Sequence, residues 1–280
     1  LLCMIPMFFY ALTGDEVYLR LAAVNLQHSA GTPYLFIIMP DSLPAPAPFV
    51  QEGFFDFPDI GQTRIIRRSD DFGRTSLSFF CGLADVGHFH MDKGSVVLQA
   101  AGEELLVDRG VLGYAHPDSL LCGMPEYHNL LMPELSGARP RQKPTRDGAY
   151  LVSAQYENGA FTAEGDVTKA WNDERVLRDT RRIESDCPET FTLVDDMVLS
   201  ESAPVSALFN TVCPCEKTER GAVIHGEKAD LVIEAVGWAP EIVCAPFGVD
   251  CTEQPVNRIA LRSAAKKEHR LTTRLTLVKK

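Results

Sequence analysis

From Phe49 to the C-terminus, short apolar or alternating segments recur between turn-forming residues, and this pattern constrains the fold more than any other feature. A side-chain period of two is typical of strands, and the Gly, Pro, Asn and Asp residues between the segments are typical of tight turns. Long helical segments do not alternate with them, so we expect a mainly β fold, a large antiparallel β-sandwich. The predicted strands are Arg64–Arg67, Ser76–Cys81, Ser95–Gln99, Leu105–Val107, Ala149–Ala154, Phe191–Val194, Ala222–His225, Asp230–Ala235 and Leu271–Val278.

A helical segment and a proline-rich linker precede the predicted strands. Residues 17–26 carry apolar side chains at near-helical spacing, and Thr13 or Asp15 can cap a helix that starts there. Three prolines between Asp41 and Pro48 fix φ and remove backbone donors, which is typical of a stiff, extended linker. We therefore expect a helical part over residues 1–40, a linker over 41–48 and a β-sandwich over 49–280.

The composition is that of an ordinary globular protein of 280 residues, with 45% hydrophobic and 23% charged side chains. The net charge of -11 argues against nucleic-acid binding, which needs a basic face, but allows an anionic substrate at a local basic cluster. The first residues are apolar but too few to span a membrane, and no membrane association is expected. We interpret them as a helix cut from a longer chain.

The eight cysteines show no C-x-x-C spacing, so we expect no zinc ribbon. Cys213-Pro-Cys215 is interpreted as a strand end, and a domain of this size does not need a disulfide scaffold. Composition does not fix the compartment; we expect a periplasmic or secreted location rather than a cytoplasmic one. The oligomeric state is left open, with a homodimer as one expectation.

The most informative short stretch is Gly87–Ser95, where His88 and His90 stand two apart and a predicted strand follows. If Ala101-Gly102 forms a tight turn, Ala100 faces Glu103 and Ser95 faces Asp108, so the histidines and Asp108 lie at the open end of one hairpin. In a straight strand His90 and Asp108 would point to opposite faces. A bulge or bend near Gly94 is therefore expected.

Two histidines and an aspartate at one place suit a divalent metal, and His128 can complete the set. Zinc binds neutral imidazole nitrogens and carboxylate oxygens at about 2.0–2.2 Å. One imidazole could instead act as an acid or base near neutral pH. The structural alternative is that these histidines only form hydrogen bonds and that Asp108 is a turn residue. The other histidines are expected to be structural or surface residues: His28, His116, His225 and His269.

Three blocks in order, His88–Ser95, Leu105–Gly110 and Tyr127-His128-Asn129, resemble the heparinase II/III-like polysaccharide lyases. They resemble especially the branch with exo-acting alginate and heparin or heparan lyases. The resemblance covers residues 87–129 and implies that an α/α-toroid precedes an antiparallel β-sandwich. The helical segment would then be the end of that toroid.

The resemblance also implies a mechanism and a division of roles. His90, Asp108 and His128 match the family's zinc ligands, with zinc in a structural or orienting role. His88 matches the histidine that points into the cleft between the domains and is the catalytic candidate. The implied reaction is β-elimination on 4-linked uronates, in which the carboxylate is neutralised, a base removes the C5 proton and an acid protonates O4. The implied partner is an acidic polysaccharide or oligosaccharide.

Two features depart from the family pattern. The tyrosine and the asparagine or histidine that complete the chemistry come mostly from the toroid, so this chain by itself could be inactive. The segment after Asn129, Leu130–Pro133, is apolar where the family continues with alternating polar residues. Tyr114 is a further candidate for the cleft, with a packed tyrosine as the alternative.

Two basic clusters could bind a polyuronate, because arginine binds carboxylates in a bidentate manner. We favour the cluster that follows His128, with Arg139 and Arg141 as the substrate-binding candidates beside Lys143 and Arg146. The other cluster contains Arg64, Arg67, Arg68 and Arg74, and a solvated face is the alternative for both. Trp171 could stack on a sugar ring or belong to the core.

Two other functions are kept open. A cupin-like metal enzyme fits Gly82 followed by His88 and His90, but Gly94 and Ser95 occupy the place of the expected glutamate. A non-catalytic carbohydrate-binding sandwich, with zinc only joining strands, fits a chain without a complete toroid. The direction of His88 distinguishes these functions, because a lyase needs this side chain in a cleft rather than in the core.

Overall fold

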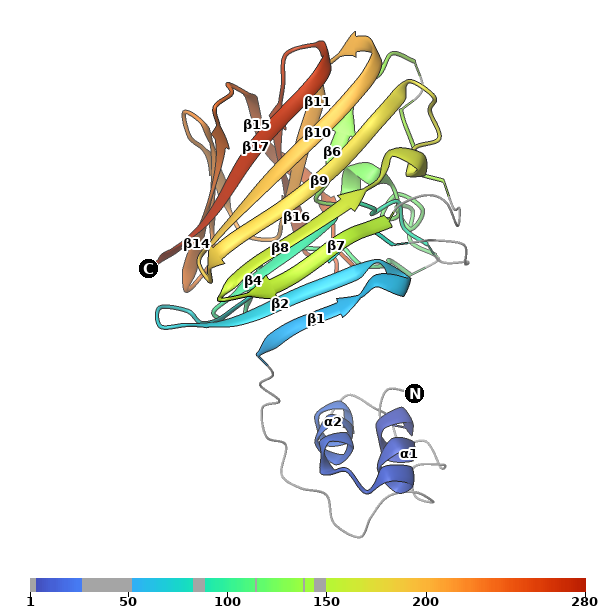
Figure 1. Cartoon of the computed structure of the whole chain (residues 1–280), viewed down its shortest axis with the longest axis vertical. Helices are drawn as coiled ribbons and strands as arrows, with labels where there is room; N and C mark the ends of the chain where they lie inside the picture. Colours follow the sequence, from blue (N-terminus) through green and yellow to red (C-terminus); the bar gives the residue numbers. More distant parts are fainter. Residues whose placement is uncertain (1–3, 27–51, 83–88, 114, 138, 144–149) are drawn as a thin grey trace. The chain divides into compact units, whose positions relative to one another are not determined.

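The computed structural model describes residues 4–26, 52–82, 89–113, 115–137, 139–143 and 150–280. The chain divides into two compact units, Leu1–Gln51 and Glu52–Lys280, which are described separately (Figure 1). The predicted linker, Asp41–Pro48, lies outside the described residues.

The first unit contains two helices, α1 (Met4–Thr13) and α2 (Glu16–Leu26), that pack against each other. Asp15 caps α2, since its Oδ1 accepts the backbone N–H of Val17 at 3.0 Å, as the sequence predicts. Phe9 stacks on Tyr18 with ring centroids 5.4 Å apart. Within the described residues, no helix combines the length and the apolar character needed to cross a membrane.

The second unit is built from three antiparallel sheets. The five-stranded sheet has the order β1 (Gly53–Phe57), β2 (Gln62–Ser69), β3 (Gly73–Phe80), β4 (Ser95–Ala100) and β5 (Glu103–Leu106). The eight-stranded sheet has the order β12 (Cys215–Lys217), β13 (Gly221–His225), β14 (Ala229–Val236), β17 (Lys266–Lys279), β10 (Thr190–Ala203), β9 (Val176–Cys187), β8 (Ala160–Asp166) and β7 (Tyr150–Glu157). The four-stranded sheet has the order β15 (Glu241–Val249), β16 (Pro255–Arg262), β11 (Val205–Thr211) and β6 (Leu131–Pro133).

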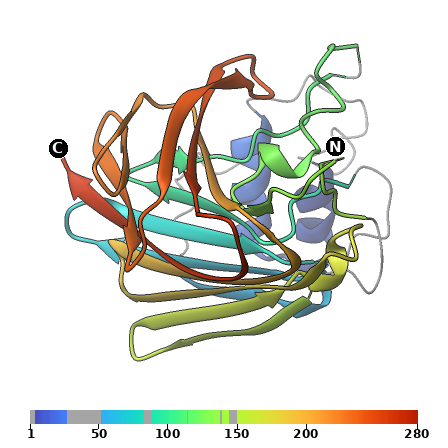
Figure 2. The ribbon, with the colours of Figure 1, turned by 90° about the horizontal axis from the view of Figure 1, so that it is seen from above.

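All three sheets contribute to one hydrophobic core, and Figure 2 shows their strands in layers. Phe79 of β3, Phe161 of β8 and Phe209 of β11 are fully buried in it. The backbone N–H of Val107, just after β5, donates to the carbonyl of Asn210 in β11 at 3.0 Å. This bond joins the five-stranded and four-stranded sheets at the place where the predicted site residues lie.

The predicted fold class is confirmed: the chain is mainly β, with antiparallel sheets and two short helices before them. Each predicted strand segment overlaps an observed strand, although Ala149 lies outside the described residues. Several strands were not predicted at all, and β9 shows why. Its inward-facing positions include the charged Asp179 and Arg181, which interrupt the apolar alternation on which the prediction depends.

Candidate metal site

The β4–β5 hairpin forms the base of the site. Ala101 and Gly102 both have positive φ, of 53° and 81°, which is the backbone of a tight two-residue turn. Ala100 pairs with Glu103, as the sequence predicts. The predicted pairing of Ser95 with Asp108 is wrong, because β5 ends at Leu106 and the register shifts within the hairpin.

The register shift is a bulge at Leu105. Gln99 pairs with Glu104 but Leu98 pairs with Leu106, so Leu105 is the extra residue of β5. Both Leu105 and Leu106 are fully buried, which a regular strand with alternating faces would not allow. A bulge of this kind redirects the side chains that follow it, here Asp108.

His90 lies outside the strand, in the segment that enters the turn Asp92–Ser95 before β4 (together called the His90 turn). The N–H of Ser95 donates to the carbonyl of Asp92 at 2.9 Å, and Gly94 has a φ of +91°. The expected bend at Gly94 is therefore present, in addition to the bulge in β5. A backbone hydrogen bond from Met91 to Gly123, at 2.8 Å, holds the His90 turn against the segment that leads to His128.

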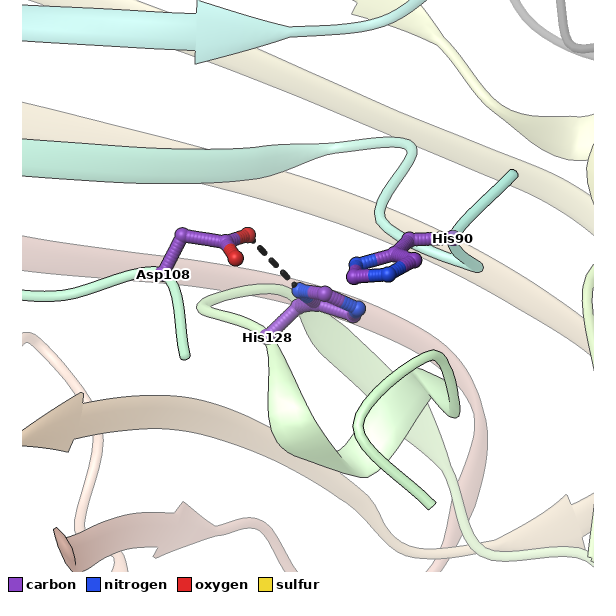
Figure 3. A group of neighbouring side chains, drawn as sticks. All are labelled: His90, Asp108 and His128. Atoms are coloured by element: carbon purple, nitrogen blue, oxygen red, sulfur yellow. Dashed lines mark hydrogen bonds and ion pairs between the residues drawn. The ribbon is translucent and has the colours of Figure 1, made fainter. Parts of the chain in front are cut away.

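These features bring His90, Asp108 and His128 together (Figure 3). Each side chain offers one potential ligand atom, and the three atoms lie within 4.8 Å of one another. His128 Nδ1 is 3.0 Å from Asp108 Oδ2, and the two imidazole centroids are 5.3 Å apart. His128 is completely buried, whereas the Asp108 side chain is 34% exposed, so the cluster opens toward solvent on one side.

The buried Nε2 atom of His128 supports a bound cation. It has no hydrogen-bond partner among the described residues, although its ring is fully enclosed. Buried polar atoms are rarely left unpaired, because the loss of water costs free energy. Two imidazoles and a carboxylate are a donor set that zinc accepts. Asp108 can either bind the ion directly or orient His128 from the other ring nitrogen.

The electrostatics favour the protonation states that a metal ligand needs. Burial lowers the pKa of His90, and the neighbouring His128 acts in the same direction, so the ring is neutral at physiological pH. Burial alone would raise the pKa of Asp108. Hydrogen bonds from His128 and from the N–H of Gly110 outweigh it, so its pKa lies below the ordinary value and the carboxylate is ionised.

The sequence model of the family described as heparinase II/III-like, C-terminal, matches residues 50–237, which include all three residues of the cluster. The chain belongs to the heparinase II/III-like family. A comparison with curated proteins gives no match.

Solved structures with the same fold include heparinases and a heparan sulfate lyase. A heparinase III has a TM-score of 0.72 at 14% identity, over 99% of this chain and 41% of its own. A second heparinase III structure has a TM-score of 0.69 at 13% identity, over 97% of this chain and 41% of its own. The heparan sulfate lyase HepC from Pedobacter heparinus has a TM-score of 0.66 at 11% identity, over 95% of this chain and 42% of its own. This heparinase II/III-like chain thus spans about two fifths of the length of these proteins, and the likeness establishes the fold.

Asn129 fixes the position of His128 in this heparinase II/III-like domain. The side chain is fully buried, and its Nδ2 donates to the carbonyls of Val96 at 2.7 Å and Val107 at 3.0 Å. Its Oδ1 accepts the N–H of Asn210 at 2.6 Å. The residue after His128 therefore ties β4, the segment after β5 and β11 to one another.

Arg181 of β9 is a further supporting residue that the sequence did not indicate. Its guanidinium is buried and pairs with Asp195 of β10 at 2.6 Å. Nη1 donates to the carbonyl of Gly94 at 2.7 Å and to that of Asn129 at 2.8 Å. One side chain of the eight-stranded sheet thus holds the His90 turn and the His128 segment together.

A stack of arginines and aromatic rings connects the segment after β5, which carries Asp108, with the segment that carries His128. The Arg109 guanidinium carbon lies 4.2 Å from the centroid of the Tyr127 ring, and its Nε donates to the carbonyl of Val249 at 3.0 Å. Arg258 stacks on Phe247, whose ring packs against Tyr127 at 4.6 Å. Because Arg109 follows Asp108 and Tyr127 precedes His128, this contact fixes the spacing between the two cluster residues.

The other predicted site residues lie in different settings. His88, Tyr114 and Arg146 fall outside the described residues. Arg139 is exposed and pairs with Glu126 at 3.1 Å, and Arg141 is exposed.

Arg67 of the other basic cluster and Trp171 have structural contacts. Arg67 is buried and donates to Ser185 and to the carbonyl of Cys187. Trp171 is a core residue whose indole N–H donates to Asp179 at 2.7 Å. His269 is buried between Ser263 and the carbonyl of Ala203, in line with its predicted structural role.

Proposed function

We propose that the chain is the C-terminal part of a polysaccharide lyase that cleaves 4-linked uronic-acid polysaccharides or oligosaccharides by β-elimination. The fold is that of the C-terminal domain of the heparinase II/III-like family. The observation that carries the proposal is the His90–Asp108–His128 cluster, with a buried imidazole nitrogen that lacks a partner among the described residues. The names of the structural neighbours, heparinase III and heparan sulfate lyase, support an acidic polysaccharide as the substrate.

In this proposal His90, Asp108 and His128 hold zinc in a structural or orienting role. Bound zinc would supply positive charge and a fixed junction between three chain segments. Elimination needs no activated water, so the ion is not required to generate a nucleophile. The neutral His90 and the ionised Asp108 are in the state that such an ion requires.

Four further residues are assigned to the chemical step and to substrate binding. The C5 proton of a uronate is weakly acidic until the charge of the adjacent carboxylate is neutralised. His88, two residues before His90, is proposed to act as a proton-transfer group in the cleft. Arg139, Arg141 and Tyr114 are proposed to bind the acidic substrate. Because the relatives are more than twice as long as this chain, activity is assigned to the longer protein.

A non-catalytic role is the second candidate for the chain by itself. The three cluster residues come entirely from the β unit, so zinc could join its strands without any chemistry. A carbohydrate-binding sandwich of this kind would bind uronate oligosaccharides without cleaving them. The cupin-like alternative is not kept, because the family match accounts for the same histidine motif.

The test uses the longer protein with alginate, heparin and heparan sulfate as substrates. We expect an unsaturated product, detected by its ultraviolet absorbance, from at least one of these polymers. His88→Ala should lower turnover by about 100-fold or more while the metal content and the thermal midpoint stay unchanged. His225→Ala, on β13, is the matched control and should retain turnover. Absence of an unsaturated product from every polymer would contradict the lyase assignment, and full activity of His88→Ala would contradict the role of that residue.

A further inference from the structure

Two cysteines meet where edge strands of different sheets come together. Cys215 is the first residue of β12, an edge strand of the eight-stranded sheet. Cys244 lies in β15, an edge strand of the four-stranded sheet, and the two strands contact each other. Each thiol is close enough to perturb the pKa of the other, and both side chains are partly buried against the core.

We propose that Cys215 and Cys244 form a disulfide site that joins the two sheets at this edge, with a small-molecule or protein disulfide as the oxidant. Both cysteines are free thiols in this structure. A disulfide requires Cα atoms roughly 4.4–6.8 Å apart and side chains that face each other. Two edge strands that contact each other, each with a cysteine packed against the same core, are an arrangement from which such a bond can form. The site is separate from the proposed metal cluster and does not depend on it.

The proposed reaction is a thiol–disulfide exchange in two steps. The thiolate of one cysteine attacks a disulfide RSSR, forms a mixed disulfide with one R–S group and releases the other as a thiolate. The thiolate of the second cysteine then attacks the protein sulfur of the mixed disulfide and releases the second R–S group. The two protein thiols are oxidised and RSSR is reduced to two RSH, which take up the two protons that the protein thiols lost.

The surroundings of the two thiols determine when this reaction occurs. Burial raises the pKa of Cys215 to about 11, and the adjacent Cys244 acts in the same direction. Burial also raises the pKa of Cys244, although the neighbouring Cys215 and the charge of Lys217 oppose this effect. Few thiolates are therefore present at neutral pH, so exchange should be slow there and faster in alkaline solution.

The remaining described cysteines provide a contrast. Cys213 precedes Cys215 by two residues, and its backbone N–H donates to the Thr211 hydroxyl at 3.1 Å. Cys187 is exposed at the end of β9, and Cys251 is exposed after β15. The segment Cys213-Pro-Cys215 is a strand end, as its sequence suggests, but Cys215 has a partner in a different sheet. A bond from Cys215 to Cys244 would fasten two edge strands, where a sheet otherwise ends in unpaired backbone groups.

The test is incubation of the native 280-residue chain with oxidised glutathione, followed by intact mass measurement and peptide mapping without reduction. We expect the chain to become two hydrogens lighter and to yield one cross-linked peptide pair containing Cys215 and Cys244. The rate should rise about tenfold per pH unit between roughly pH 7 and pH 9, because the thiolate fraction rises by that factor. The thermal midpoint should increase by roughly 5–10 °C in the cross-linked form, given a typical disulfide contribution.

Three variants separate this site from general oxidation. Cys215→Ser and Cys244→Ser should each abolish the cross-link, whereas Cys213→Ser, two residues away, should retain it. The proposal is overturned if mapping of the wild-type chain finds both thiols still alkylatable after exposure to oxidised glutathione at alkaline pH. It is also overturned if the cross-link joins Cys215 or Cys244 to another cysteine, or if the Cys213→Ser variant loses it.

Discussion

At the scale of single residues, Asn129 shows how one buried side chain determines the geometry of the candidate site. Its amide satisfies two carbonyls and one backbone N–H from three different segments. The sequence marked this position only because it follows His128. Its three partners are distant in the chain, so the hydrogen bonds could not be inferred from sequence spacing.

Replacement of Asn129 by alanine should destabilise the protein strongly. The carbonyls of Val96 and Val107 and the N–H of Asn210 would remain buried without their partner. We expect the free energy of unfolding in urea to fall by about 3 kcal/mol or more. Asn172→Ala, at an exposed position, is the control and should change it by less than about 0.5 kcal/mol. Equal effects of the two substitutions would show that the Asn129 bonds contribute little.

Asp179 provides a pH-dependent prediction. Burial raises its pKa from 3.8 to about 7, although the Trp171 N–H donates to it. The folded protein therefore retains a proton that the unfolded chain releases above about pH 4. The stabilisation associated with this carboxyl is fully present below that pH and is lost as the pH rises through about 7.

Asp179→Asn keeps a hydrogen-bond acceptor for Trp171 and removes the ionisation. Its unfolding free energy relative to the wild type should therefore increase as the pH rises from about 5 to about 9, measured by urea denaturation at each pH. Asp186→Asn, at an exposed position of the same strand, should show no such trend. A pH-independent difference for Asp179→Asn would contradict the raised pKa.

At the scale of secondary-structure elements, β9 supports the site through Arg181. The side chains of Arg181 and its partner Asp195 are 2% and 1% exposed. The guanidinium also donates to the carbonyls of Gly94 and Asn129. Removal of one member of a buried ion pair leaves an unpaired charge, which is costly. Arg181→Ala should lower the free energy of unfolding by about 3–5 kcal/mol.

A double substitution separates this stability effect from the effect on the site. Arg181→Met with Asp195→Leu removes both charges and should recover much of the stability. The ties to Gly94 and Asn129 remain broken, so zinc affinity measured by competition with a chelator should still fall, by roughly tenfold. Arg178→Ala, which breaks the partly exposed pair with Asp196, should change both quantities little. Wild-type zinc affinity in the double variant would show that Arg181 has no positioning role.

The hairpin shows which part of an element the sequence can predict. The turn at Ala101 and Gly102 follows from local backbone preference, and its register beside Glu103 was predicted correctly. The expected bend near Gly94 is present, but the bulge at Leu105, where two consecutive leucines are both buried, was not predicted. Packing from other strands determines which residue becomes the extra one, so the local sequence left its place undetermined.

At the scale of the whole molecule, the period-two pattern was sufficient for the fold class but not for the arrangement of three sheets. The pattern shows that a strand buries one face, whereas sheet membership depends on contacts between distant segments such as β10 and β17. The site was predicted as a group because His90, Asp108 and His128 flank one hairpin and the following segment. Arg181 and the Arg109–Tyr127 stack were missed because buried charges look like surface residues in a sequence.

The central claim is that His90, Asp108 and His128 bind a divalent metal, and elemental analysis of the purified chain tests it most directly. The wild-type protein should contain about one zinc per chain, and His90→Ala should lose it together with part of its thermal stability. His225→Ala, a partly exposed histidine paired with Asp230, should retain the metal. A wild-type chain without metal after exposure to zinc, or equal metal content in the wild type and His90→Ala, would contradict the claim.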